Sequence, residues 1–137
     1  MTHKVTKHTF FEMKQRGEKI AALTSYDYLC TKLMEGTGVD MILVGDSLGM
    51  VVLGFENTLP VTVEEIIHHT KAVARARPRA FVVADMPFMS YQASVDDAVR
   101  NAGRFVQEGG ADAVKLEGGE RTSPAVRRIV ETGMAVM

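Results

Sequence analysis

The chain has 137 residues, a formal net charge of −1 and 24% charged residues, which suggests one domain with no bulk electrostatic attraction to nucleic acid or anionic membranes. The polar N-terminal segment and the lack of any long apolar run exclude a signal peptide and a membrane span, so we expect a soluble, cytoplasmic protein with a globular core. Cys30 is the only cysteine, which excludes an internal disulfide and a multi-cysteine metal site.

The first half of the chain alternates helical and strand patterns. Gly17 ends the first helix, and Gly36 and Gly38 end the second, whose apolar residues recur at helical spacing. A loop of about fifteen residues then separates two apolar segments, a length that indicates a functional segment. The predicted order is a helix over 6–16, a strand over 20–24, a helix over 26–33, a strand over 41–44 and the loop over 46–60.

The second half repeats this alternation more regularly. Thr62 to Glu65 has the form of a capping box, and Ser123-Pro124 is a favoured helix start. The two longest helices carry the same spacing of apolar residues. The predicted order is a helix over 63–74, a strand over 81–84, a helix over 95–106, a strand over 113–116, a helix from 123 that ends at 133, and a strand over 134–137.

Alternating strands and helices predict right-handed βαβ units and a parallel α/β sheet. Doubly wound sheets and (β/α)8 TIM barrels both fit this pattern, but no GxGxxG follows the first strand, which disfavours the dinucleotide-binding version. A complete barrel needs roughly 250 residues. The chain supplies about half of one and stops at the beginning of a fifth apolar strand, so we expect a fragment or a truncated frame.

Three predicted strands end in an acidic residue: Asp46, Asp85 and Glu117. Because parallel strands end on one side of a sheet, we expect these carboxylates to lie at one mouth, where they suit a divalent cation. The alternative for each Asp is a helix cap or turn residue. Lys115, inside an apolar strand, needs a partner when buried, and the alternative to a functional role is a structural ion pair with Glu117 on the same strand face.

Four segments together resemble one enzyme family. TSYDYLCTKL, VDMILVGDSLGMVVLGFENTLPVTVEEIIHHT, ADMPFMSY and DAVKLEGGE are similar to the N-terminal half of ketopantoate hydroxymethyltransferase, and the similarity runs from about Thr6 to Met137. The resemblance implies that residues 1–137 are the N-terminal half of a single (β/α)8 TIM-barrel domain of the phosphoenolpyruvate/pyruvate superfamily, truncated at the start of strand five. It also implies hydroxymethyl transfer from 5,10-methylenetetrahydrofolate to 3-methyl-2-oxobutanoate, which gives 2-dehydropantoate in the coenzyme A pathway of pantothenate biosynthesis.

The same resemblance assigns residues to a site. Asp46 and Asp85 would bind Mg²⁺, with Mn²⁺ or Co²⁺ also compatible with oxygen ligands, and Glu117 would complete or support the metal shell. Ser47 and Lys115 would hold the oxo acid, so the substrate-binding set is Asp46, Ser47, Asp85 and Lys115. A metal that chelates the oxo acid acts as a Lewis acid and stabilises the enolate formed at C3.

The family's general base, a glutamate, belongs to the second half of the barrel, and a histidine that lines the site follows just after Met137. No catalytic residue is therefore assigned in this chain, and we expect the isolated fragment to be inactive or nearly so. The family implies a homo-oligomer, often a decamer, with 3-methyl-2-oxobutanoate and methylenetetrahydrofolate as small-molecule partners and with no nucleic acid or membrane partner.

Two alternatives stay open. The first is a carbon–carbon lyase related to phosphoenolpyruvate mutase and isocitrate lyase, which is disfavoured because Met86-Pro87 follows Asp85 where a DxD-type acidic run is expected. The second is a non-catalytic half-barrel that needs a partner half. Near the site, Tyr26 and Asp27 are interpreted as packing and capping residues at the start of a helix.

Overall fold

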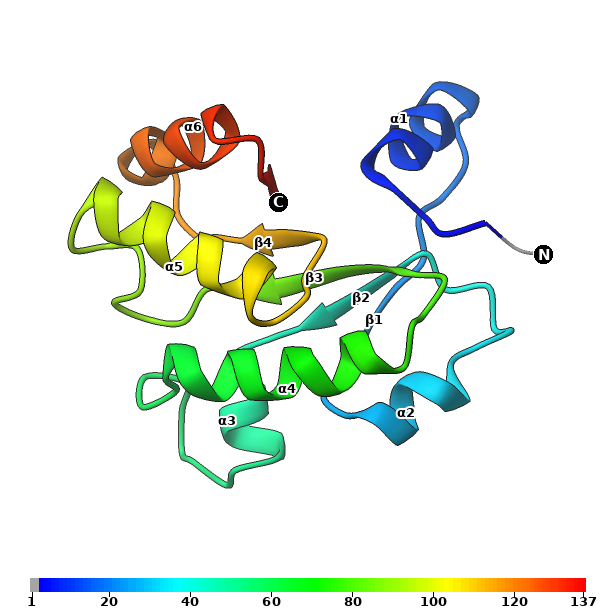
Figure 1. The fold of residues 1–137 in the computed structure, drawn as a ribbon, viewed down its shortest axis with the longest axis horizontal. Helices are drawn as coiled ribbons and strands as arrows, with labels where there is room; N and C mark the ends of the chain where they lie inside the picture. Colours follow the sequence, from blue (N-terminus) through cyan, green and yellow to red (C-terminus); the bar gives the residue numbers. More distant parts are fainter. Residues whose placement is uncertain (1–2) are drawn as a thin grey trace.

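The computed structural model describes residues 3–137 and shows one five-stranded parallel sheet in the order β1-β2-β3-β4-β5 (Figure 1). Every strand pairs with its neighbour in the sequence, and the order never reverses, as in a (β/α)8 barrel and unlike a doubly wound sheet. The strands are β1 (Ala22–Thr24), β2 (Met41–Val44), β3 (Phe81–Asp85), β4 (Ala113–Lys115) and β5 (Ala135–Val136).

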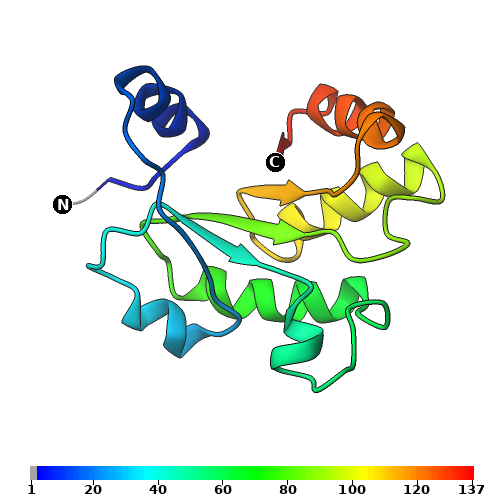
Figure 2. The ribbon, with the colours of Figure 1, turned by 180° about the vertical axis from the view of Figure 1, so that it is seen from behind.

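The helices that connect the strands lie against one face of this sheet. They are α2 (Tyr28–Leu33), α3 (Leu48–Val51), α4 (Val63–Arg75), α5 (Val95–Gln107) and α6 (Ser123–Glu131), with a 3₁₀ turn over Glu120–Thr122. A separate helix, α1 (Lys7–Arg16), lies on the opposite side of the sheet from α4 in both views (Figures 1 and 2). Among residues 3–137 no helix combines the length and the apolar character of a membrane span.

Strand residues alternate between the two faces. The outward residues pack with α4, α5 and α6 into the main core, in which Ile66, Phe105 and Ile129 are fully buried. The inward face is covered in part by α1, whose Phe10 ring contacts Phe81 edge to face at 5.3 Å. An apolar groove of about 620 Å³ remains between α1 and the inward face. The outward residues are Ile42, Val44, Val82, Ala84 and Val114, and the inward apolar residues are Met41, Leu43, Phe81, Val83 and Ala113.

Side-chain caps explain where several helices begin. The Thr62–Glu65 capping box is present, since the Thr62 hydroxyl accepts from the Glu65 amide and the Glu65 carboxylate accepts from the Thr62 amide. Asp27 accepts from the Cys30 amide at 2.7 Å and caps α2, as the sequence predicts. The Ser94 hydroxyl caps α5 in the same way.

The structure corrects the bounds of several predicted elements: the helix predicted over 26–33 begins at Tyr28, and the strand predicted over 134–137 covers only Ala135–Val136. The segment 46–60 is not a continuous loop, because it contains the short helix α3. The predicted strands 20–24 and 113–116 are shorter, whereas β3 extends by one residue to include Asp85. Asp85 therefore belongs to the sheet itself, where the backbone determines the direction of its side chain.

Candidate active site at the carboxyl ends of the strands

Asp85 and Lys115 form the centre of the candidate site. They are register partners on β3 and β4, and both have the parity of the inward-facing residues of their strands. The Lys115 ammonium lies 2.9 Å from Oδ1 of Asp85. The Asp85 side chain is only 6% exposed and that of Lys115 15% exposed. The lysine predicted to need a partner therefore has one on the neighbouring strand.

The two charged groups are shifted in different ways by burial. Burial raises the pKa of Asp85, and the nearby Asp46 carboxylate adds to the rise, although Lys115 opposes it. Burial alone would lower the pKa of Lys115, but its hydrogen bonds to Glu117 and Asp85 outweigh burial and raise that pKa. Lys115 therefore stays protonated, and burial keeps the pKa of Asp85 above its ordinary value despite the ion pair.

Glu117 is held differently from the other two acids. Its carboxylate accepts a 2.8 Å hydrogen bond from Lys115 but is 77% exposed, and Lys115 lowers its pKa. Its backbone is fixed by Tyr91, whose hydroxyl donates to the Glu117 carbonyl and accepts from the Glu117 amide. The Lys115–Glu117 ion pair considered from the sequence is present, in addition to the Asp85 pair.

Asp46 and Ser47 follow β2 at the same end of the sheet. The Asp46 amide donates to Oδ2 of Asp85 at 3.2 Å, which ties the end of β2 to the side chain at the end of β3. Gly45 provides the space for this approach, because a Cβ there would lie 3.1 Å from Oγ of Ser47 and 3.7 Å from Oδ2 of Asp85. The structure thus brings all the predicted site residues to one end of the sheet, although it does not test their predicted roles.

Tyr26 belongs to this cluster, which the sequence interpretation missed. Its hydroxyl lies 2.8 Å from Oγ of Ser47, and its carbonyl oxygen lies 2.7 Å from Nδ1 of His69 on α4. The sequence treats Tyr26 as a packing residue. The available signal was its position two residues after a predicted strand, the same offset as that of Asp46.

Two of the three predicted ligands of a hard cation, Asp46 and Asp85, stand together at the strand ends. Across residues 3–137 no hydrogen bond or ion pair reaches the Asp46 carboxylate, and the Asp85 side chain accepts from the Asp46 amide, so two carboxylates of the type that binds divalent ions lie near each other. Glu117 does not join them, since its carboxylate bonds Lys115. In the same range no three His, Cys, Asp or Glu side chains are grouped closely enough to hold a metal ion. The assignment of Asp46, Asp85 and Glu117 to Mg²⁺ stays a prediction.

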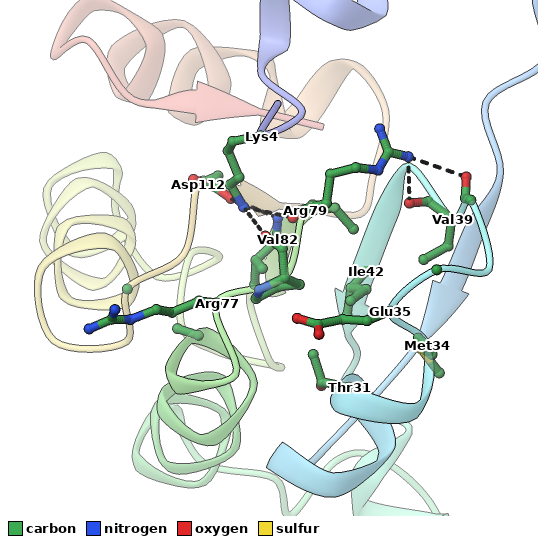
Figure 3. Close-up of a pocket in the computed structure, with 16 residues that line it drawn as sticks. Lys4, Thr31, Met34, Glu35, Val39, Ile42, Arg77, Arg79, Val82 and Asp112 are labelled. Atoms are coloured by element: carbon green, nitrogen blue, oxygen red, sulfur yellow. Dashed lines mark hydrogen bonds and ion pairs between the residues drawn. The ribbon is translucent and has the colours of Figure 1, made fainter. Parts of the chain in front are cut away.

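A larger cavity, of about 850 Å³, lies at the opposite, amino end of the strands (Figure 3). Two of its cations, Lys4 and Arg79, are already bound within the fold. Lys4 contacts Asp112 and the Ala80 carbonyl, and Arg79 bonds Asp40 and two carbonyl groups. Because Lys4 and Arg79 hold strand starts together, we place the candidate active site at the carboxyl end. There the buried Asp85–Lys115 ion pair lies near the Asp46 carboxylate, which no hydrogen bond or ion pair reaches within residues 3–137.

Comparisons with known proteins identify the family of this chain. Residues 4–137 match the family described as ketopantoate hydroxymethyltransferase. The 3-methyl-2-oxobutanoate hydroxymethyltransferase of Moorella thermoacetica is 62% identical over 134 residues, which cover 98% of this chain and 50% of the relative. That of Syntrophus aciditrophicus is 58% identical over 134 residues, 98% of this chain and 49% of the relative. The chain spans about half the length of the curated relatives it matches.

Solved structures show the same fold at low sequence identity. A crystal structure of 2,3-dimethylmalate lyase, a member of the PEP mutase/isocitrate lyase superfamily, superposes with a TM-score of 0.70 at 14% identity and covers 96% of this chain and 50% of that one. Oxaloacetate acetylhydrolase superposes with a TM-score of 0.68 at 12% identity, covering 98% of this chain and 52% of that one. The chain therefore has the parallel α/β fold of about half of each of these structures.

Proposed function

This chain belongs to the ketopantoate hydroxymethyltransferase family, and from that premise we propose that it provides the oxo-acid and metal side of a hydroxymethyltransferase active site. The reaction would move a hydroxymethyl group from 5,10-methylenetetrahydrofolate to 3-methyl-2-oxobutanoate and give 2-dehydropantoate. One observation supports this most: Asp46, Asp85 and Lys115 meet at one end of the strands in a chain 62% identical to a relative of that name.

The role proposed for each site residue follows from the charge of its side chain. Lys115 presents a fixed positive charge beside the position where the oxo-acid oxygens become negative as the C3 proton leaves, which lowers the barrier electrostatically. The Ser47 hydroxyl would hold an oxygen of the same acid. Asp46 and Asp85 would hold Mg²⁺, Mn²⁺ or Co²⁺, with Glu117 as a more distant support. When bound, such a cation supplies Lewis acidity toward the oxo and carboxylate oxygens.

We assign removal of the C3 proton to no residue of this chain, and we therefore propose that residues 1–137 alone turn over little or no substrate. A cytoplasmic location and a decameric assembly remain predictions from composition and from the family resemblance. The lyase alternative is not favoured, because the lyase and hydrolase structures share only 12–14% identity with this chain. The non-catalytic half-barrel remains untested.

The proposal is tested first by binding. Titration calorimetry with 3-methyl-2-oxobutanoate and Mg²⁺ should show binding to the unaltered chain and at least about tenfold weaker binding to Lys115→Met, which lacks the buried charge. Lys14→Met, an exposed lysine on α1, is the matched control and should bind like the unaltered chain. Absence of oxo-acid binding by the unaltered chain, with or without Mg²⁺, would refute the proposal.

Activity is tested by reconstitution. The chain is mixed with the separately produced second half of the Moorella thermoacetica relative, and 2-dehydropantoate is measured by mass spectrometry. We expect product from the mixture and none from either half alone. Cleavage of 2,3-dimethylmalate or oxaloacetate by the mixture, without 2-dehydropantoate formation, would favour the lyase alternative instead.

A further inference from the structure

The strand ends of β1 and β2 are connected by a hydrogen bond that the sheet itself does not require. The Tyr26 hydroxyl after β1 lies 2.8 Å from Oγ of Ser47 after β2. A phenol is a stronger acid than an aliphatic hydroxyl, so Tyr26 is the better donor and Ser47 the acceptor. Among residues 3–137 no other partner of the Ser47 hydroxyl is found, which leaves its own hydrogen free to be donated to a ligand.

The position of Tyr26 is itself fixed from the outer helices. Its carbonyl oxygen lies 2.7 Å from Nδ1 of His69, and since a carbonyl only accepts, Nδ1 of His69 carries the hydrogen. On the other side, the Thr31 hydroxyl donates to the Asp27 carbonyl at 2.7 Å and lies 2.9 Å from Oγ of Ser25. The segment 25–27 is thus held by α2 and α4 while the phenol reaches back to β2.

We infer that Tyr26 is a positioning residue, anchored by His69, that turns the Ser47 hydroxyl into a directed hydrogen-bond donor for the 2-oxo acid. This inference rests on the proposed function, which identifies the ligand. Tyr26 would act on the ligand only through Ser47, because its hydroxyl hydrogen is engaged with Ser47. The family assignment gives Ser47 a binding role, whereas the structure adds the group that orients it.

A double-mutant cycle separates this role from general stabilisation. Tyr26→Phe removes the hydrogen bond to Ser47. We therefore expect this variant to bind 3-methyl-2-oxobutanoate about fivefold more weakly in the presence of Mg²⁺. In a Ser47→Ala background the same change should weaken binding less than about twofold, because no hydroxyl remains to be oriented. Equal effects in both backgrounds would overturn the inference, as would unchanged affinity of Tyr26→Phe.

His69 is tested with its neighbour as the control. His69→Ala removes the donor to the Tyr26 carbonyl and should weaken oxo-acid binding, whereas His69→Gln, whose amide can donate to the same carbonyl, should restore most of it. His68 is adjacent and exposed, so His68→Ala should bind like the unaltered chain. Equal weakening by His68→Ala and His69→Ala would contradict the assigned anchor.

Failure of the proposed function gives a different experimental result from failure of the positioning role of Tyr26. If the unaltered chain does not bind the oxo acid at all, the ligand assignment fails, and the Tyr26–Ser47 bond is then tested without ligand. In a ¹H–¹⁵N spectrum, Tyr26→Phe should shift the Ser47 amide resonance while the helix α5 resonances stay in place. An unmoved Ser47 resonance would refute the positioning role whatever the ligand is.

Discussion

Asp85 and Lys115 are direct register partners on adjacent parallel strands, and the 2.9 Å ion pair between them is the most buried charged contact at the carboxyl end of the sheet among residues 3–137. Cross-strand partners on one face lie close enough for side chains to interact without bending the backbone. The backbone pairing of β3 and β4 thus places the two charges, and loss of Lys115 alone would leave Asp85 buried without its cation.

Removal of Lys115 should therefore destabilise the fold more than removal of an ordinary lysine. Lys115→Met leaves Asp85 buried without its cation, and we expect the free energy of unfolding to fall by about 3 kcal/mol at pH 7, near the lower end for breaking a buried pair. The loss should shrink at acidic pH, where Asp85 takes up a proton. Urea unfolding of the double variant Asp85→Asn/Lys115→Met provides the control, since it should recover much of the loss at pH 7.

The free energy of unfolding should change with pH because Asp85 titrates. Burial raises its pKa above the ordinary 3.8, so its contribution to stability is fully present below that value and is lost as pH rises through the raised pKa. Asp85→Asn does not titrate, so its stability relative to the unaltered chain should improve as pH increases across this window. Denaturant unfolding at a series of pH values measures this difference, and a constant difference would contradict the raised pKa.

Titration of the exposed Glu117 should change the free energy of unfolding with pH in the opposite direction and by a smaller amount. Lys115 lowers the pKa of Glu117, so its contribution is present above the ordinary 4.5 and is lost as pH falls through the lowered value. Solvent screening keeps this contribution small because the side chain is 77% exposed. The measured difference between the Asp85→Asn variant and the unaltered chain should therefore follow Asp85.

Gly45 should be sensitive to the addition of a single methyl group. A Cβ at this position would lie 3.1 Å from Oγ of Ser47, so Gly45→Ala should displace that hydroxyl. We expect oxo-acid binding to weaken roughly tenfold by misplacement of the group, with a change of about 1 kcal/mol or less in the free energy of unfolding. Gly103→Ala in α5 meets nothing within 4 Å and should instead stabilise the chain by about 0.5–1 kcal/mol. Calorimetric titration and urea unfolding of both variants measure these effects.

Tyr91 should stabilise the backbone after β4. Its buried hydroxyl donates to the Glu117 carbonyl at 3.0 Å and accepts from the Glu117 amide at 3.2 Å. Tyr91→Phe leaves both groups without this partner, and we expect a loss of about 1–3 kcal/mol in the free energy of unfolding. Thermal and urea unfolding measure it against Tyr28→Phe, an exposed tyrosine that should change stability little. Similar stability of both variants would show that water replaces the Tyr91 hydroxyl.

Much of the fold follows from local patterns in the sequence. The strands are short apolar runs between glycines or prolines, and α4 and α5 carry strong caps and evenly spaced apolar residues, so periodicity and capping predict them. The short helix α3 was not predicted, because four residues provide too little periodicity to distinguish a helical turn from a loop.

The candidate site was predicted less completely than the fold, because its contacts join residues far apart in the sequence. The strand-end positions of Asp46, Asp85 and Glu117 follow from parallel pairing, but which groups touch depends on register and on side-chain direction. The hydrogen bond of Tyr26 to Ser47 joins residues 21 positions apart, and that of His69 to Tyr26 joins a helix to a strand end. The exposed direction of Glu117, bonded to Lys115, likewise depends on the backbone after β4, which Tyr91 holds.

The consecutive order of the five strands has a consequence for how the charged end of the sheet is assembled during synthesis. Each strand pairs with the one translated just before it, so the sheet can extend by one strand at a time as the chain leaves the ribosome. The Asp85 carboxylate then meets the Asp46 amide of an earlier strand, and the Lys115 ammonium meets an Asp85 that is already in place. Lys115 is thereby enclosed only after its acidic partner Asp85 has been made.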